Sequence, residues 1–396
     1  MSKIAIIGAG ASGLLCSIEC AKAGVEVDVF EQNSKCAKKI LVSGNGRCNI
    51  TNTTITQNDY FSDNTDFVKY ALENFSFSEF EKFASSIGLI LDIKDDGKAY
   101  PLSNEAKSVA MLLESYATNL GVNFHLESKV SDLQIMLNSY DSVVIATGSE
   151  AASHLGGNSD GQNFAKECGH NIIPTYPSLV QLHLNSVSHA KMSGTKVDGE
   201  VTLFINNQSS ATCQGDILFT NYGVSGFAIL DISQLASESL MNFQTVDIAV
   251  NLLPKYTAQK LSAHIMKIAE LNRDITLLDV LHGLLPIKIV KAILDELQFS
   301  HTMRASEINT KLSKKLANQI LNWKFEVSNT HGFRHAEVSG GGVDTKEVNP
   351  KTMESLIQKN LYFCGEVLDV VGRRGGFNFA WAWASGHLCA KDIIKH

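Results

Sequence analysis

The sequence predicts an α/β protein in which both ends of the chain build one domain, with a unit of antiparallel strands and helices inserted between them. Three observations predict this arrangement. The first 31 residues contain a strand, a glycine-rich turn, a helix and a second strand in the order of a βαβ unit. Apolar and polar residues alternate at Val180–Leu184 and Gly199–Thr220, and short apolar runs followed by glycines return after 336. At 396 residues the chain is also long for a single core.

The opening stretch has the pattern of a dinucleotide-binding unit. Ile4–Ile7 is a short apolar run of the buried-strand type, a helical stretch extends to about Ala23, and Val25–Phe30 forms a second strand that ends at Glu31. The turn before the helix reads Gly-x-Gly-x-x-Gly. This order, with an acid about 20 residues after the glycines, is typical of a Rossmann-type fold that binds a dinucleotide. A bare helix-capping turn is the alternative.

Each glycine of this turn has a physical role. Gly8 permits a tight exit from the strand, Gly10 lets a pyrophosphate approach the backbone, and Gly13 lets the helix pack against the strand. The N–H groups and the positive dipole end of the helix would face the phosphates. Glu31 can accept hydrogen bonds from ribose hydroxyls, and its charge would repel a 2′-phosphate. The stretch therefore predicts a bound dinucleotide.

Residues 1–177 are expected to form the first part of this domain. Gly44–Asn52 carries two glycines, an arginine and short polar side chains, so we expect a loop whose backbone can approach a flat ligand. An ordinary glycine-rich turn is the alternative. Residues 60–90 read as helices whose phenylalanines belong to the core. Asp141–Gly148 is a buried strand ending in Thr-Gly, where strand ends should face the cofactor.

Residues 178–335 are expected to form a separate unit on the substrate side. Gly199–Thr220 alternates apolar and polar residues around a turn at Asn206–Gln208, as antiparallel strands do. From about 257 to 322 the pattern becomes helical, and Pro286 is placed as a first-turn residue of one helix.

Residues 336–396 are expected to return to the first domain. Glu337–Asp344 and Asn360–Glu366 are short strands that run into glycines, and Gly375–Ser385 opens the last helix. The paired glycines lie at the N-terminus of that helix, where the dipole end is positive. A well-packed terminal helix without a binding role is the alternative.

Composition excludes several classes of protein. The net charge is −7 and lysines and arginines form no run beyond pairs, which disfavours nucleic acid or an anionic membrane as partner, although a local basic patch can hide behind the total. No apolar stretch reaches spanning length, and no targeting segment precedes the first strand. Eight cysteines without CxxC and twelve histidines without HExxH predict no metal and a reduced, cytoplasmic protein.

Longer motifs carry a resemblance to a known family. They are Ser43–Asn52, Asp216–Gly226, Gly341–Asp344, Thr352–Ser355, Leu361–Asp369, Gly375–Asn378 and Trp383–Gly386. With the opening glycines and Glu31, they resemble the bacterial BaiN/YhiN-like family of FAD-dependent oxidoreductases over nearly the entire chain. Phe377, Phe379 and the pair Arg373–Arg374 depart from the family pattern, and the two arginines put the expected substrate polarity in doubt.

The resemblance implies a Rossmann-like FAD-binding domain built from both chain ends, with an inserted β-barrel-like domain and a helical subdomain. It also implies non-covalent FAD. By position, the implied cofactor contacts are Gly8, Gly10, Ala11, Ser12, Gly13, Glu31, Gln32, Lys39, Ser43, Gly46, Arg47, Cys48, Asn49, Val130, Thr147, Gly148, Gly365, Glu366, Gly375, Gly376, Phe377 and Asn378.

Chemistry is expected where the last helix begins. Reduction of a flavin places negative charge near its N1 and C2 carbonyl, and free N–H groups at 376–378 would stabilise that charge. Arg47 is a candidate catalytic residue beside it. His335 is a second candidate, because it lies where the inserted unit rejoins the first domain. A surface His–Arg pair is the alternative for His335 and its neighbour Arg334.

These expectations predict an FAD-dependent oxidoreductase, a reductase of a small conjugated or cyclic organic substrate with NAD(P)H as electron source. No second strand–Gly-x-Gly-x-x-Gly–helix unit exists in the sequence, so NAD(P)H would have to visit the flavin transiently. Three alternatives stay open: a flavin amine oxidase that uses O2, a tRNA-modifying flavoprotein, and a non-catalytic flavin redox sensor. The substrate and the oligomeric state cannot be read from one chain.

Overall fold

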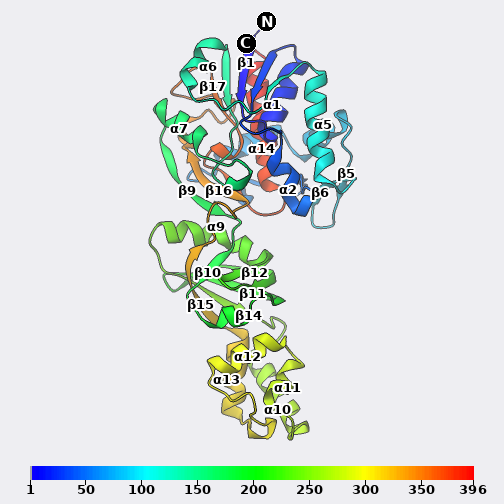
Figure 1. Ribbon diagram of the computed structural model, residues 1–396, viewed down its shortest axis with the longest axis vertical. Coiled ribbons are helices and arrows are strands. Elements are labelled where there is room, and N and C mark those ends of the chain that lie inside the picture. Colours follow the sequence, from blue (N-terminus) through cyan, green and yellow to red (C-terminus); the bar gives the residue numbers. More distant parts are fainter. Residues whose placement is uncertain (1) are drawn as a thin grey trace. The chain divides into compact units, whose positions relative to one another are not determined.

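The structure is a computed structural model that describes residues 2–396 (Figure 1). The chain divides into two compact units. The composite unit contains the residues up to Pro177 together with Phe333–His396, and the inserted unit contains Ser178–Gly332. The composite unit holds a parallel sheet with helices, and the inserted unit holds a closed antiparallel barrel with helices. The fold class predicted from the sequence is confirmed.

A five-stranded parallel sheet forms the centre of the composite unit. Its order is β17 (Leu361–Phe363), β8 (Ser142–Ile145), β1 (Lys3–Ile7), β2 (Glu26–Phe30) and β7 (Asn123–His125). In register, Ile7 pairs with Phe30 and Ile145, and Ile145 pairs with Phe363. The carboxyl ends of these four strands are therefore level. The C-terminal segment supplies an edge strand of the same sheet as the N-terminal βαβ unit.

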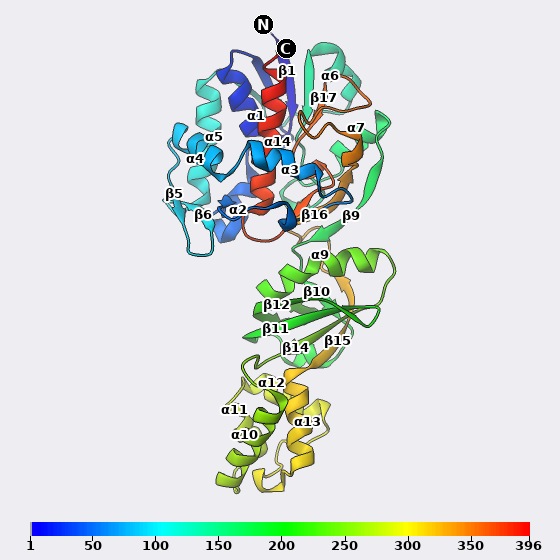
Figure 2. The same cartoon turned by 180° about the vertical axis from the view of Figure 1, so that it is seen from behind.

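Three helices pack together beside this sheet: α1 (Ala11–Lys22), α5 (Ala106–Asn119) and α14 (Phe377–Ile393). Figures 1 and 2 show α1, in blue, next to α14, in red. Gly386 permits this approach, because a Cβ there would lie 2.6 Å from the carbonyl oxygen of Ser12. The first and last helices of the chain are thus in direct contact.

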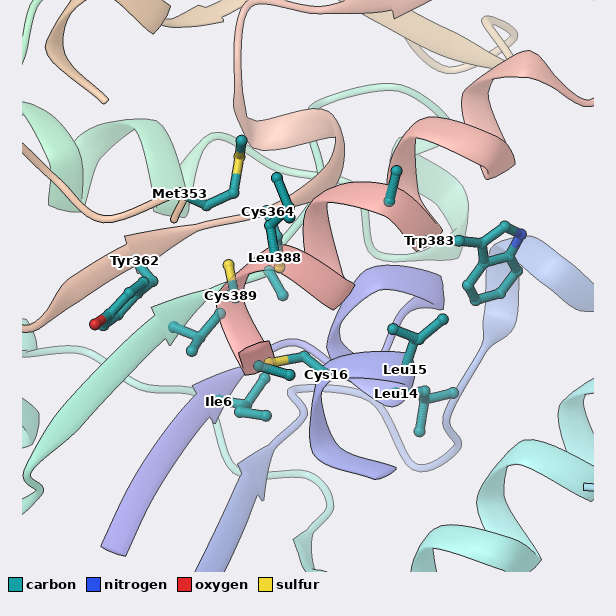
Figure 3. Close-up of a cluster of buried hydrophobic side chains, with 14 of the residues drawn as sticks. Ile6, Leu14, Leu15, Cys16, Met353, Tyr362, Cys364, Trp383, Leu388 and Cys389 are labelled. Carbon is teal, nitrogen blue, oxygen red and sulfur yellow. The ribbon is translucent and has the colours of Figure 1, made fainter. Parts of the chain in front are cut away.

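The core joins the two chain ends. Figure 3 shows Ile6 of β1, Leu14 of α1, Tyr362 of β17 and Leu388 and Cys389 of α14 in one cluster, and each is at most 2% exposed. Burying one such aliphatic side chain stabilises the fold by about 1.5–3 kcal/mol. Burial, together with contact with the Cys364 thiol, holds the pKa of Cys389 well above its usual range. These sulfur atoms therefore act as packing groups.

The remaining elements of the composite unit surround the sheet. They are α2 (Lys38–Gly46), β3 (Thr51–Asn52), β4 (Tyr60–Phe61), α3 (Phe67–Asn74), α4 (Phe77–Ser86), β5 (Leu91–Ile93), β6 (Lys98–Pro101), α6 (Leu133–Ser139), α7 (Asp160–Glu167), β9 (Ile172–Ser178), β16 (Val338–Val343) and β18 (Val371–Gly372). Short 3₁₀ turns of the whole chain are η1 (Gln57–Asp59), η2 (Ser153–Leu155), η3 (Ala305–Glu307), η4 (Thr345–Glu347) and η5 (Gly365–Val367).

One local prediction needs correction. Gly44–Asn52 was expected to be a loop throughout, but it begins within α2 and ends in β3. The backbone leaves helical geometry at Ser43, and Gly44 and Asn45 adopt left-handed φ values of 56°. Glycine and asparagine tolerate this conformation best, so the helix changes direction there. The pattern of a loop and that of a helix broken at its end differ little in sequence.

The inserted unit contains a closed barrel. Around it the order is β10 (Leu182–Leu184), β13 (Gly223–Ser225), β12 (Gln208–Phe219), β11 (Lys196–Ile205), β14 (Val246–Asn251) and β15 (Trp323–Thr330). Asn206 and Asn207 connect β11 to β12 with left-handed φ values of 50° and 64°, as tight hairpin turns require. Two helices, α8 (Ser188–Lys191) and α9 (Phe227–Met241), belong to this unit and were not predicted.

Four helices between β14 and β15 form the helical subdomain: α10 (Ala258–Leu271), α11 (Leu277–His282), α12 (Ile287–Glu296) and α13 (Thr310–Leu321). Thr257, Thr276 and Asn309 cap three of them, each accepting a backbone N–H with its side chain. Pro286 is the residue before α12 rather than within its first turn. Across residues 2–396, no helix has both the length and the apolar character that crossing a bilayer requires.

Candidate functional site

The predicted cofactor residues gather at the carboxyl edge of the parallel sheet. Ile7, Ile145 and Phe363 lie in one row, so the segments that follow them leave the sheet side by side. These segments are Gly8–Gly13, Ala146–Gly148 and Cys364–Glu366. The hydroxyl of Ser12 donates to the carbonyl of Cys364 at 3.5 Å, which links the N-terminal and C-terminal parts of this edge. In α/β folds this edge is where ligands bind.

The three glycines of the first turn differ in what surrounds them. A Cβ on Gly8 would lie 2.4 Å from the carbonyl oxygen of Ala146, and one on Gly13 would lie 2.1 Å from that of Gly8. Both glycines are thus required by the packing of the protein itself. A Cβ on Gly10 would have no neighbour within 4 Å, and its φ of −82° suits any residue. Gly10 therefore borders open space at the start of α1.

Glu31 is fixed against that turn. Its Oε2 accepts the N–H of Ala9 at 3.0 Å, and its Oε1 accepts the backbone and side-chain N–H groups of Asn33 at 2.8 and 2.6 Å. A carboxylate has about four acceptor positions, so it can accept further hydrogen bonds. The chain near Val130 lies beside Glu31, because the N–H of Ser128 donates to the Glu31 carbonyl at 2.9 Å.

A polar group around Glu366 joins three segments of the chain. Its Oε2 lies 2.7 Å from Nζ of Lys39, and its Oε1 accepts the hydroxyl of Ser149 at 2.6 Å and the N–H of Ser339 at 2.8 Å. The Lys39 and Glu366 side chains are 34% and 18% exposed. Both were predicted to contact the cofactor, and the structure pairs them with each other across 327 positions of sequence.

The segment from Ser43 to Asn49 has an unusual backbone. Gly44, Asn45, Gly46 and Cys48 all have positive φ, and the N–H of Cys48 donates to the Ser43 carbonyl at 3.0 Å. Burial raises the pKa of the Cys48 thiol to about 11, which keeps it protonated at neutral pH. The buried Oδ1 of Asn49 has no hydrogen-bond partner in residues 2–396. An acceptor in that position is available to a bound ligand.

Arg47 lies at the surface of this segment. Its guanidinium stands over the ring of Tyr100, 5.5 Å from the ring centre, and its Nε donates to the Gly44 carbonyl at 3.4 Å. Arg47 is exposed, whereas Tyr100 is partly buried. The pair is a flat, cationic surface beside the segment that was predicted to flank the flavin ring.

The start of α14 is held by the N-terminal part of the chain. A Cβ on Gly376 would lie 2.4 Å from the carbonyl oxygen of Thr51, and Gly375 accepts the side-chain amide of Asn52 at 2.9 Å. Tyr60 donates its hydroxyl to the Phe377 carbonyl at 2.9 Å. Neither α14 nor α1 has a side-chain cap or an acidic residue in its first turn. Their first N–H groups are thus available to an anionic ligand.

The side-chain amide of Asn378 has protein partners at both of its ends. Its side chain accepts the N–H of Gly372 at 2.8 Å and donates to the Gly372 carbonyl at 2.8 Å, so both ends of the amide clamp β18. Any contact of this residue with a ligand therefore involves its backbone N–H. No local pattern around Asn378 predicts these hydrogen bonds.

Comparison with known proteins identifies the relatives of this chain. The family model described as HI0933-like protein Rossmann domain matches residues 2–392. This chain belongs to that family. It is 32% identical to the 3-dehydro-bile acid Δ(4,6)-reductase of Clostridium scindens, with 100% of each chain covered. It is 33% and 31% identical to the ribosomal RNA dihydrouridine synthases of Haemophilus influenzae and Escherichia coli, with 97–98% of each chain covered.

The predicted relationship to the BaiN/YhiN-like family is confirmed, and this protein is an FAD-dependent oxidoreductase. Its residues fit the cofactor. Gly10 and Gly148 border open space, the helix N-termini of α1 and α14 are uncapped, and the buried Oδ1 of Asn49 lacks a protein partner. These are features of a surface shaped to contact a dinucleotide closely.

The remaining residues that were predicted to contact the cofactor or to act in catalysis have the following surroundings. Gln32 donates its side-chain amide to the Gly156 carbonyl at 2.6 Å, and Ser43 donates to the Ile40 carbonyl at 2.8 Å. A Cβ on Gly161 would lie 2.1 Å from Oγ1 of Thr147, so α7 also reaches this edge. His335, the second catalytic candidate, is exposed on the surface of the composite unit.

Three residues that lie at the candidate site were not among the predicted site residues: Ser149, Tyr100 and Asn52. Ser149 is 2% exposed, donates to Glu366 and lies directly after the predicted Thr147–Gly148 pair. Asn52 ends a motif that was noted for its glycines and arginine. Ser149 could have been predicted from its position directly after a strand end. No feature of the sequence around Tyr100 indicates that it lies at the site.

The inserted unit has a polar aromatic group of its own. Nε2 of His183 and Nδ1 of His331 are 2.7 Å apart, and the ring of Tyr222 stacks on His331 at 4.1 Å. His189 is buried near them, and burial lowers its pKa below the usual value. No group of three or more histidine, cysteine or acidic side chains within 2–396 is arranged to hold a metal ion.

Proposed function

We propose that this protein reduces a carbon–carbon double bond conjugated to a carbonyl group, with FAD as the hydride carrier. Two differently named groups of relatives support this chemistry. A 3-dehydro bile acid with Δ(4,6) unsaturation carries double bonds conjugated to its 3-oxo group. A dihydrouridine synthase saturates the ring double bond of uracil, which is conjugated to a ring carbonyl. The shared reaction is addition of a hydride to the far carbon and a proton to the near carbon.

The uncapped N-terminus of α14 is the observation that carries this proposal. It begins after Gly375 and Gly376, which Thr51 and Asn52 hold in place, and it has no acidic residue in its first turn. When bound, FAD supplies the hydride chemistry. The chain would hold its pyrophosphate at Gly8–Gly13 and its ribose at Glu31. Backbone N–H groups of residues 376–378 would stabilise negative charge without reorganisation, which favours the reduced cofactor.

The electron source that we propose is NAD(P)H. The chain has one Gly-x-Gly-x-x-Gly turn, so the donor would visit the composite unit briefly rather than bind a domain of its own. The test is anaerobic stopped-flow mixing of the FAD-loaded protein with NADPH, NADH or a simple amine such as benzylamine. We expect either dinucleotide to bleach the absorbance near 450 nm and the amine to leave it unchanged. Bleaching by the amine alone would establish the amine oxidase alternative instead.

A second form of the same reaction has a base of RNA as its substrate. The two ribosomal RNA dihydrouridine synthases, at 33% and 31% identity over nearly the whole chain, favour it. The tRNA-modifying alternative is a variant of this form. Enzyme reduced with dithionite should be mixed separately with a steroid dienone and with unmodified ribosomal RNA. Loss of the dienone absorbance supports the small-molecule form, whereas a mass gain of two hydrogens in an RNA fragment supports the RNA form.

A further inference from the structure

Charge is divided unevenly along this chain. Residues 252–322, the helical subdomain, contain ten lysines and arginines and six aspartates and glutamates, which gives a net charge of +4. The whole chain has a net charge of −7, so everything outside this segment carries −11. The barrel residues of the inserted unit and the composite unit are both acidic. Of these three parts of the chain, only the helical subdomain has a net positive charge.

The positive charge is concentrated on α13. Lys311, Lys314 and Lys315 lie three and four positions apart, so they share one face of the helix, and all three are exposed. We call them the lysine stripe. The opposite face, formed by Ser313, Leu316, Ala317 and Ile320, is buried, and Ser313 shares a 2.9 Å hydrogen bond with Ser262 of α10. Helix α13 contains no acidic residue.

The acidic residues of the subdomain do not neutralise the stripe. Asp279 is the acceptor for Thr276 at the start of α11, and Glu307 accepts the N–H of Arg304. Asp295 pairs with Lys191 at 2.6 Å and with His301 at 2.8 Å. Within residues 2–396, no carboxylate lies within ion-pair distance of the lysine stripe. Lysines 311 and 315 are also four apart, where like charges oppose helix formation.

The chemistry of the surface selects a polyphosphate rather than a lipid. A helix that lies on a membrane mixes lysines with exposed apolar side chains. The outward face of α13 instead carries Thr310 and Asn318 with the lysines, and no large exposed apolar side chain of the described residues lies on this helix. Lysine ammonium groups on a polar face match the phosphates of a nucleic acid backbone.

We propose that the helical subdomain is an RNA-binding module and that the lysine stripe contacts RNA phosphates. This inference rests on the RNA form of the proposed function, and it names the surface that would hold such a substrate. It assigns sequence-independent binding to the stripe. The acidic remainder of the chain would repel RNA elsewhere, so the charge division itself directs where RNA binds.

The experiment compares three versions of the FAD-loaded, full-length protein. The test variant is Lys311→Gln, Lys314→Gln, Lys315→Gln. The control is Lys107→Gln, Lys166→Gln, Lys359→Gln, which removes the same charge from three exposed lysines of the composite unit that have no ion pair in the described chain. Fluorescence anisotropy with a fluorescein-labelled RNA stem-loop gives the affinity at several salt concentrations.

The unchanged protein and the control should bind the stem-loop with similar affinity. The test variant should bind at least about tenfold more weakly, and the slope of log K against log salt should fall by about 1 for each lysine removed. Equal losses in both variants, or unchanged binding by the test variant, would overturn the proposal. So would absence of RNA binding by the unchanged protein, or tighter binding to phosphatidylglycerol vesicles than to RNA.

Two further readouts keep the result clear. Ultraviolet crosslinking of the unchanged protein to the same RNA should yield crosslinked peptides that include 310–321, and crosslinks confined to other segments would contradict the assignment even if the test variant fails to fold. The reduction assays described above are independent of this one. RNA that binds the stripe but is never reduced leaves the module intact and refutes the RNA form of the function. Dienone reduction without RNA binding would overturn the module and support the small-molecule form of the function.

Discussion

The composite unit and the helical subdomain use charge in opposite ways. In the composite unit, charged groups such as Lys39, Glu366 and Asp28 are partly or fully buried and have partners from distant segments. In the helical subdomain, the lysines of α13 are exposed and lack ion pairs within the described chain. We therefore expect the composite unit to hold its ligand through the geometry of its site, and the helical subdomain to hold RNA through its surface charge. One net charge for the whole chain describes neither.

The largest expected effect comes from the glycine-rich turn, where one glycine is needed for packing and another borders the space for the ligand. Gly13→Ala places a methyl group against the Gly8 carbonyl, 2.1 Å away, so α1 must shift. We expect a loss of about 3 kcal/mol or more in the free energy of unfolding, or no folded protein. Gly10→Ala is the matched change, because its methyl group meets open space. It should keep the melting temperature of the FAD-free protein and weaken FAD binding at least tenfold. Thermal unfolding and FAD titration measure both.

A pH experiment tests how far buried charge stabilises the composite unit. Burial of Asp28 opposes its ionisation, but hydrogen bonds from Tyr140, Asn123, His125 and Lys3 outweigh burial and lower its pKa to about 2. The unfolded chain has a value of about 3.9, so the folded state binds fewer protons. The stabilisation is complete above about pH 4 and is lost as the pH falls from 4 to 2.

Asp28→Asn should therefore lower the free energy of unfolding at pH 7 by up to about 2 kcal/mol. It should also flatten the decline in stability between pH 4 and 2, as measured by urea unfolding at each pH. A variant that keeps the full decline would show that other carboxylates cause it.

The ion pair at Glu366 provides a smaller effect in the same unit. Glu366→Gln keeps an acceptor for Ser149 and Ser339 but leaves the Lys39 ammonium without its anion. We expect a loss of about 1–2 kcal/mol in stability. Glu79→Gln removes an ion pair with Lys82 that is open to solvent, and its melting temperature should not change measurably. Equal effects from the two changes would mean that the position of Glu366 in the site has no energetic consequence.

The smallest expected effect has the opposite sign and belongs to the helical subdomain. Lys311→Gln removes a like-charge contact with Lys315 on α13 and should stabilise the protein by about 0.3 kcal/mol. The same change should weaken RNA binding. Urea unfolding and anisotropy on one preparation would test both signs together. A destabilised variant would mean that Lys311 supports the fold, which would remove it from the lysine stripe.

The sequence pattern predicted those structural elements that are formed by residues close together in the sequence. The βαβ unit of residues 3–30 follows from apolar runs, three glycines and an acid, and the β11–β12 hairpin follows from alternation around Asn206–Gln208. Helix α9 was not predicted, because serines occupy several of its buried positions and interrupt the apolar spacing of a helix. The position of residues 128–130 beside Glu31 could not be predicted from their own pattern, because it depends on the hydrogen bond between Ser128 and Glu31.

Contacts between distant segments could not be predicted in the same way. Nothing near Lys39 or Glu366 indicates that they pair, because their proximity depends on β17 joining the sheet beside β8. Asn378 was expected to contact the flavin, yet its side chain holds Gly372. Charge was summed over the chain, although the sequence already contains the division between residues 252–322 and the rest. The first two contacts become visible only in coordinates, whereas the division of charge is visible when charge is counted segment by segment.

The position of β17 at the edge of the sheet, with α14 against α1, has a consequence for biosynthesis. A ribosome that has made residues 1–177 must still translate the inserted unit before the last strand and helix emerge. At about 5–20 residues per second this takes roughly ten to thirty seconds. During that interval β8 has an open edge and α1 lacks its neighbour, so the nascent chain needs protection from aggregation. Yellow colour in a growing culture would therefore report completed polypeptides only.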